Sequence, residues 1–179
     1  MKRYIALLRG VNVGKARRVP MADLRALMEA LGLSRVRTLL NSGNAVFDAK
    51  GGSTASHAKQ LKAAIREKTG VDCEVIVKTA ADLAAAIAEH PLRQHAQDDA
   101  RMQVMFTQDA AALAELKPLE AGDWAPEVFA VGQHAAWLWC AGGIIESRIA
   151  KAVGKVLGDR GTARNWATVE KLQAMVWAD

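Results

Sequence analysis

One stretch near the start of the chain decides the fold, and it reads Arg3-Tyr4-Ile5-Ala6-Leu7-Leu8-Arg9-Gly10-Val11-Asn12-Val13-Gly14-Lys15-Ala16-Arg17-Arg18-Val19-Pro20. The unbroken apolar run from Tyr4 to Leu8 predicts a strand that is buried on both faces. This strand leads into a loop with two glycines and four basic residues, and Pro20 then predicts the start of a helix. No acidic residue occurs among the first 22 positions. A buried strand that leads into such a loop is a suitable place to hold an anion.

The rest of the first half follows this strand in the order helix, strand, strand, helix, strand. Gly32 and Gly70 each predict the C-terminal end of a helix, and Ser53 or Thr54 predicts the N-terminal cap of the second one. The tight reversal Asn41–Asn44 joins two strands into a hairpin. The predicted elements are a helix from Pro20 to Gly32, strands at 36–40 and 45–47, a helix from 53 to 70, and a strand at 73–78. This β-α-β-β-α-β order predicts a ferredoxin-like lobe.

The second half repeats the order with a weak last strand. Its predicted elements are strands at 102–107, 128–131 and 135–140, helices from Asp109 through 116 and from Ser147 to Gly158, an edge piece near 162–163, and a final helix from about 168 to 177. We therefore predict an α+β protein of two ferredoxin-like lobes in tandem, packed together, with mainly antiparallel sheets. The predicted boundaries are lobe 1 at 1–79, a short helix and linker at 80–100, and lobe 2 with a C-terminal helix at 101–179. Because residues 4–8 do not alternate, we expect the other half or a terminal helix to cover the far face of the first sheet.

Composition excludes several classes of protein. No window approaches the 18 consecutive apolar residues of a transmembrane helix, and the N-terminus is too short for a secretory signal because Arg9 interrupts its apolar run. Cys73 and Cys140 each lie in an apolar strand pattern, where a buried free thiol is the usual state. We expect a cytoplasmic protein without disulfides and without a membrane partner.

The net charge of +5 is unevenly distributed along the chain. Residues 1–40 and 146–171 are rich in Lys and Arg, whereas residues 80–130 are mainly acidic. This pattern fits either two basic surfaces or ordinary solvated charge.

The basic loop allows two interpretations. It is not a P-loop, because only three residues separate Gly10 from Gly14 and Ala16 stands where Ser or Thr is required. A looser anion site would use Arg9 and Lys15 for charge, with the glycines allowing close approach of the backbone and Asn12 lying between them. The alternative is a flexible basic loop whose glycines serve turns.

Two further polar stretches are also open to both a structural and a functional interpretation. In the reversal, Asn41, Ser42 and Asn44 would either bond their own backbone or form a polar clamp beside the loop. The clamp requires that the first and third strands are neighbours. Near the C-terminus, Arg164, Asn165, Trp166 and Thr168 would either bind a phosphate or a base, or start a helix with Asn165 or Thr168 as its cap.

Other kinds of site find no support in the sequence. The four histidines have no ligand-like spacing with one another or with the cysteines, so we expect no metal site and no cofactor. The histidines are His57, His90, His95 and His134. There is also no Gly-x-Ser-x-Gly elbow.

Together, three stretches resemble an uncharacterised bacterial family catalogued as domain of unknown function 1697. They are Arg9–Gly14, Pro20–Arg25 and Asn41–Phe47, and Thr162–Leu172 resembles the C-terminal motif of that family. The resemblance covers essentially the whole chain and implies a duplicated ferredoxin-like fold, but no activity. Lys15 and Ala167 depart from the family pattern, which often has Gly and Asn there.

We consider three functions. The first is a binding module for a phosphate-bearing partner, either a nucleotide-like metabolite or nucleic acid, through the basic loop. The second is a small enzyme acting on an anionic substrate, stabilised by Arg9, Asn44 and Arg164, with Ser42 or Asp48 as its reactive group. The third is a protein-interaction module that uses exposed tryptophans.

Overall fold

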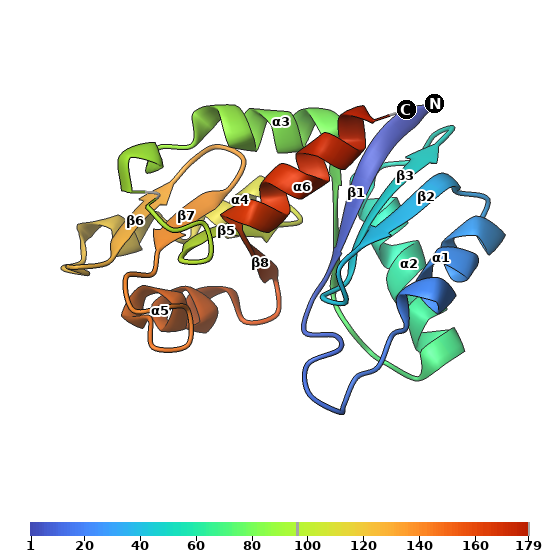
Figure 1. Cartoon of the computed structure of the whole chain (residues 1–179), viewed down its shortest axis with the longest axis horizontal. Helices are drawn as coiled ribbons and strands as arrows, with labels where there is room; N and C mark the ends of the chain where they lie inside the picture. The colour runs from blue at the N-terminus through green and yellow to red at the C-terminus, as the bar shows by residue number, and fades with distance from the viewer. Residues whose placement is uncertain (96, 179) are drawn as a thin grey trace. The chain divides into compact units, whose positions relative to one another are not determined.

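The computed structural model describes residues 1–95 and 97–178, which form two units. Unit 1 contains residues 1–81 and the C-terminal residues from Ala174 onward, and unit 2 contains residues 82–173. Each unit has a four-stranded antiparallel sheet with helices against it (Figure 1).

Unit 1 has the predicted β-α-β-β-α-β order. Its elements are β1 (Lys2–Leu8), α1 (Met21–Ala30), β2 (Ser34–Leu39), β3 (Asn44–Ala49), α2 (Thr54–Thr69) and β4 (Val75–Thr79). The strand order β2-β3-β1-β4 is that of a ferredoxin-like sheet and makes β1 and β3 antiparallel neighbours. The predicted helix ends are confirmed. Ser53 caps α2 in a capping box with Ser56, and Gly70 ends that helix in the left-handed conformation.

Unit 2 repeats this architecture with the strand order β6-β7-β5-β8. Its elements are α3 (Ala80–Glu89), η1 (Arg93–His95), β5 (Met102–Thr107), α4 (Ala110–Ala114), η2 (Lys117–Ala121), β6 (Val128–Val131), β7 (Ala136–Trp139), α5 (Arg148–Leu157), β8 (Gly161–Asn165) and α6 (Trp166–Trp177). The first two residues of α3 and the last turn of α6 belong to unit 1. The fold class predicted from the sequence, α+β with two ferredoxin-like halves, is therefore confirmed.

Two details of unit 2 differ from the sequence-based expectation. The helix predicted through Leu116 ends at Ala114 and continues as the 3₁₀ helix η2, whose second residue, Pro118, lacks the N–H that an α-helix would use. The last strand, β8, is a full five-residue edge strand paired with β5. Among the described residues, no helix is long and apolar enough to cross a membrane.

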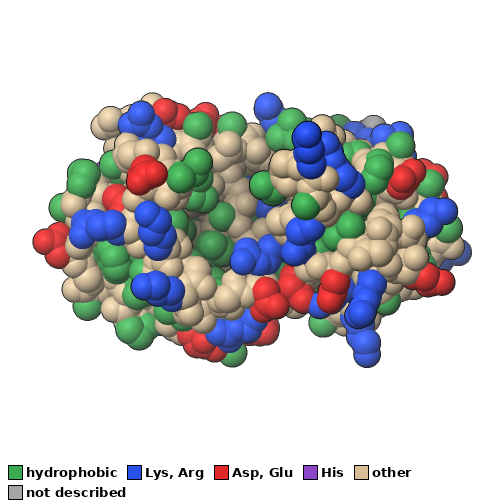
Figure 2. Space-filling model, turned by 90° about the horizontal axis from the view of Figure 1, so that it is seen from below, with side chains coloured by type: hydrophobic (Ala, Val, Ile, Leu, Met, Phe, Trp, Pro, Cys, Tyr) green, Lys and Arg blue, Asp and Glu red, His purple; other side chains and the backbone are tan. Residues whose placement is uncertain are grey.

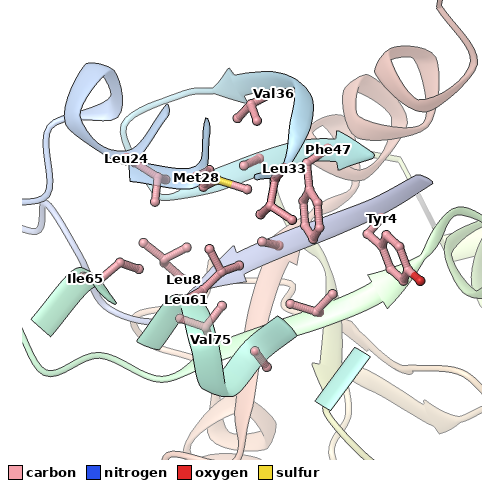
Figure 3. Packing of buried hydrophobic residues seen from close by; sticks show 14 of the residues in the cluster. Tyr4, Leu8, Leu24, Met28, Leu33, Val36, Phe47, Leu61, Ile65 and Val75 are labelled. Atoms are coloured by element: carbon pink, nitrogen blue, oxygen red, sulfur yellow. The ribbon is translucent and has the colours of Figure 1, made fainter. Parts of the chain in front are cut away.

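The core of unit 1 lies between its sheet and the helices α1 and α2. Tyr4 and Leu8 of β1 point to this side together with Phe47 of β3, and the apolar faces of both helices cover them (Figure 3). The alternate residues Ile5 and Leu7 point to the other face of the sheet and are also fully buried. Burial of β1 on both faces, as predicted from its unbroken apolar run, is confirmed.

A buried ion cluster connects β1, β2 and β3 on that second face. The two oxygens of Asp48 accept hydrogen bonds from Arg3 Nε at 2.9 Å and Arg35 Nε at 2.5 Å. Arg35 reaches Asp48 from a bulge in β2, where its φ is +49°. Arg3 also donates to the carbonyl oxygens of Val176 and Ala178, at the C-terminal end of α6. The end of this helix therefore lies over the second face of the sheet, and the cation complements its exposed carbonyls.

Candidate functional site

The loop at residues 9–20, which connects β1 to α1, is held in shape by Asn12. The Asn12 side chain donates to Val19 O at 2.8 Å and Asn41 O at 2.7 Å, and it accepts from Val19 N at 2.9 Å. A backbone bond from Asn12 N to Arg17 O closes the tip of the loop. One side chain thus fixes the base of the loop and ties it to the reversal at residues 41–44.

The cations of the loop lie on its outer side. Lys15 and Arg18 are exposed and form no ion pair within the described part of the chain. Arg17 Nη2 donates to Asp72 O at 2.9 Å, and Arg9 is anchored through its backbone N–H to Glu74 O. The loop is the lowest part of the trace in Figure 1. Figure 2 shows the protein from that side, with unit 1 in the right-hand part of the picture. Lys and Arg side chains are spread over this face, and a group of acidic side chains lies beside them.

The backbone of this loop is unusual in its conformation. Gly10, Asn12, Gly14 and Arg17 all have φ between +54° and +61°, and Leu40 in the facing reversal has φ +57°. Non-glycine residues occupy this region at a cost, and such residues concentrate at functional sites. A Cβ on Gly10 or Gly14 would meet nothing within 4 Å, so their φ rather than crowding by the protein requires glycine. The surface at both glycines is open to a ligand.

The reversal at residues 41–44 lies beside the loop, as the clamp interpretation requires, because β1 and β3 pair directly. Asn44 is fully buried and donates to Leu39 O at 2.8 Å and Ser42 Oγ at 3.0 Å, so its role is to hold the turn. Asn41 and Ser42 are exposed. The loop and the exposed part of the reversal together form the candidate site, which we call the loop site.

The C-terminal candidates lie in unit 2, and there each has a structural role. Arg164 is 8% exposed and donates to Thr162 Oγ1 and Ala163 O, and burial lowers its pKa to about 10. Asn165 Oδ1 accepts from Thr168 N at 3.0 Å, which caps α6 and explains why this helix starts earlier than predicted. Trp166 is buried against the rings of His90 and Trp137. The helix-start interpretation accounts for Asn165, Trp166 and Thr168, whereas Arg164 bonds to residues of its own strand β8.

The sequence did not single out His90, which forms a buried aromatic cluster with these tryptophans. Its ring stacks on Trp137 at a centroid distance of 3.9 Å. Burial, with a smaller contribution from Arg93, lowers the pKa of His90 to about 4, so it is neutral near pH 7. His90 Nδ1 accepts from Leu92 N, whereas His90 Nε2 and Trp137 Nε1 are buried and have no hydrogen-bond partner among residues 1–95 and 97–178. No local sequence signal marks such a contact, because the three residues are far apart in the chain.

Other reactive groups are buried or engaged. Cys73 and Cys140 are both buried free thiols, and burial raises the pKa of each. Within the described residues, no group of three or more His, Cys, Asp and Glu side chains could hold a metal ion. Burial by itself raises the pKa of Asp48, but the hydrogen bonds from Arg3 and Arg35 outweigh it and leave the pKa below its ordinary value. Asp48 is therefore an ionised structural partner of two arginines and a poor general base.

Comparison with known proteins agrees with this architecture. The chain is similar to a solved structure described as that of the conserved bacterial protein SP0830 from Streptococcus pneumoniae, with a TM-score of 0.80 and 25% sequence identity over 98% of each chain. No curated protein matches. The sequence profile of a family described as "Protein of unknown function (DUF1697)" matches residues 1–137, a range that includes the whole loop site. The chain belongs to the DUF1697 family.

Proposed function

We propose that unit 1 binds a phosphate-bearing partner at the loop site. The observation that carries the proposal is the Asn12 brace, because it holds the base of the loop in one conformation while the basic tip stays open to solvent. A loop that is ordered before binding loses less conformational entropy on binding, so more of the contact energy appears as affinity. The brace thus argues against the alternative of a merely flexible basic loop.

The loop offers backbone donors as well as cations. Several N–H groups at its tip donate to no acceptor in the described part of the chain, namely those of residues 13–15 and 18. Successive backbone N–H groups around left-handed residues form concavities that bind anions. With Lys15 and Arg18 beside them, these donors suit a phosphate group, whose several oxygens accept charge-assisted hydrogen bonds.

The enzyme hypothesis has less support. Asp48 is buried and ionised between Arg3 and Arg35, and Ser42 Oγ accepts a hydrogen bond from Asn44. Both oxygens of Asp48 are engaged by arginines, so this carboxylate is a poor base. The interaction-module hypothesis rested on exposed tryptophans. Trp137 is fully buried, whereas Trp177 is exposed. Binding of an anion remains the function that the residues favour.

The test is a calorimetric titration with ATP and with inorganic pyrophosphate at about 50 mM salt. We expect the double variant Lys15→Ala/Arg18→Ala to bind at least about tenfold more weakly, since each charge-assisted hydrogen bond contributes roughly 1.5–3 kcal/mol. The matched control is Arg25→Ala/Lys50→Ala, which removes the same charge from exposed positions of unit 1 outside the loop. An equal loss in both variants would contradict the proposal, as would the absence of binding to every phosphate-bearing probe, whether ATP, pyrophosphate or a nucleic acid.

A further inference from the structure

A second basic surface lies on helix α2 of unit 1. Lys59, Lys62 and Arg66 are spaced so that they share one face of the helix, and they line a groove of about 560 Å³ together with Ala63 and Glu67. Lys59 and Arg66 are exposed and have no ion-pair partner among the residues described. This surface, which we call the α2 groove, was not part of the site expected from the sequence.

The α2 groove adjoins the loop site through Asp72. Arg17 of the loop donates to the backbone oxygen of Asp72 at 2.9 Å, and Lys62 Nζ lies 3.7 Å from its carboxylate. Lys62 also forms an ion pair with Glu74. The two acids between the loop site and the groove are thus partly neutralised by a lysine that belongs to the groove.

The length of this surface indicates the size of the ligand. From Lys59 to Arg66 the helix rises about 10 Å, at about 1.5 Å per residue. A nucleic acid strand carries one phosphate per roughly 3.4 Å of helix axis, so the groove alone matches about three phosphates. A single phosphate group or a mononucleotide that is bound at the loop is too short to contact the α2 groove at the same time.

Base stacking on the sheet of unit 1 is excluded. Ferredoxin-like sheets that bind RNA stack bases on exposed aromatic residues of their central strands. Here the central strands carry Tyr4 and Phe47, whose rings stack on each other beneath the helices (Figure 3). Contacts from the loop and from α2 would therefore reach phosphates and not base edges.

We infer that the partner is a nucleic acid whose phosphodiester backbone is bound, without readout of its sequence, by the loop site and the α2 groove together. This inference rests on the proposed function, because the loop site is one end of the surface that would bind the nucleic acid. It extends that function by naming a polymer in place of a single phosphate-bearing molecule. The cations expected to touch phosphates are Lys15 and Arg18 of the loop and Lys59 and Arg66 of the helix.

The test is fluorescence anisotropy with a labelled DNA duplex of about 20 base pairs, between roughly 50 and 200 mM salt. Log affinity falls with log salt concentration, and each phosphate contact makes that fall steeper by about 0.9. We expect Lys59→Ala/Arg66→Ala to reduce the steepness of the fall by almost two, equally for duplexes of different sequence. The control Arg25→Ala/Lys68→Ala removes the same charge. Lys68 lies on α2 but lines a different groove, with Asp23, and should leave the slope nearly unchanged.

Three outcomes would overturn the inference. An unchanged slope in Lys59→Ala/Arg66→Ala would show that the α2 groove does not contact the phosphates. Binding of ATP or pyrophosphate without binding of the duplex would leave the proposed function intact and make the partner a small metabolite. Failure of all three probes would remove the proposed function as well.

Discussion

The two units share a strand order but differ in the connection that follows their first strand. In unit 2, residues 108 and 109 alone join β5 to α4, and Asp109 caps the helix by accepting from Ala112 N at 2.8 Å. In unit 1 the same connection takes twelve residues, 9–20. Because two residues suffice to build the fold, the remaining residues of the loop are not required for it. The comparison supports our proposal that the longer connection carries a binding surface.

The units also differ in the polar group that each one buries. Unit 1 buries the charged carboxylate of Asp48, paired with Arg3 and the more exposed Arg35, whereas unit 2 buries the neutral ring of His90 against Trp137. A buried charge and a buried neutral base respond to acid in different pH ranges. Substitution and acidification can therefore disturb one unit at a time.

The largest effect is expected from Asp48→Ala. Removing this carboxylate leaves the largely buried Arg3 without its ion-pair partner, whereas Arg35 is 57% exposed and can turn to solvent, so we expect a cost of about 3 kcal/mol of unfolding free energy, at the lower end for buried pairs. Urea denaturation followed by circular dichroism measures the loss. The matched control is Glu115→Ala in unit 2, which breaks an exposed pair with Arg160 and should cost much less. Equal losses in the two variants would show that the buried cluster has no special role.

The next effect concerns pH and unit 2. The pKa of His90 is lowered to about 4 in the folded protein, so the unfolded chain takes up its proton first as the pH falls below about 6.5. The stability that neutral His90 provides is complete above that pH and is lost as the pH falls toward 4. The expected loss is about 3 kcal/mol. Denaturation followed by tryptophan fluorescence measures it, because four of the five tryptophans lie in unit 2.

The variant His90→Phe separates this titration from others. Phenylalanine keeps a ring against Trp137 but carries no proton, so the dependence on pH between 6.5 and 4 should become flatter. The Asp48 carboxylate, whose pKa is held below its ordinary value, contributes its stability above about pH 4 and loses it only as the pH falls further. An identical pH profile for His90→Phe and the unaltered chain would show that His90 does not cause the loss.

The smallest effect compares the hairpin turns of the two units. Gly43 has φ +84°, and a Cβ there would lie 2.7 Å from Leu8 Cβ, so Gly43→Ala combines strain with overpacking and should cost about 2 kcal/mol. At Gly132 a Cβ would meet only the carboxylate of Glu89, which can move but then loses its hydrogen bonds to the turn. We expect about 1 kcal/mol for Gly132→Ala. Thermal denaturation of both variants measures the two losses of stability. A larger loss of stability for Gly132→Ala than for Gly43→Ala would contradict our interpretation of the two turns.

Much of the fold could be predicted from the sequence, because the signals were local. The unbroken run Tyr4–Leu8 predicted a strand buried on both faces, and Ser53 and Gly70 marked the two ends of α2. Each of these depends on neighbours within a few residues. The basic loop could be recognised for the same reason, since its charges and glycines are contiguous.

The roles of individual polar residues were decided only by the tertiary structure. Asn12 braces the loop because β1 and β3 pair and bring Asn41 beside it, and Asp48 meets Arg3 and Arg35 through the register of three strands. Arg164, which a sequence can assign equally well to a phosphate or to a structural contact, is buried on strand β8. The sequence by itself determined which elements form. Contacts between residues far apart in the chain decided which polar groups face solvent and which are buried in hydrogen bonds within the protein.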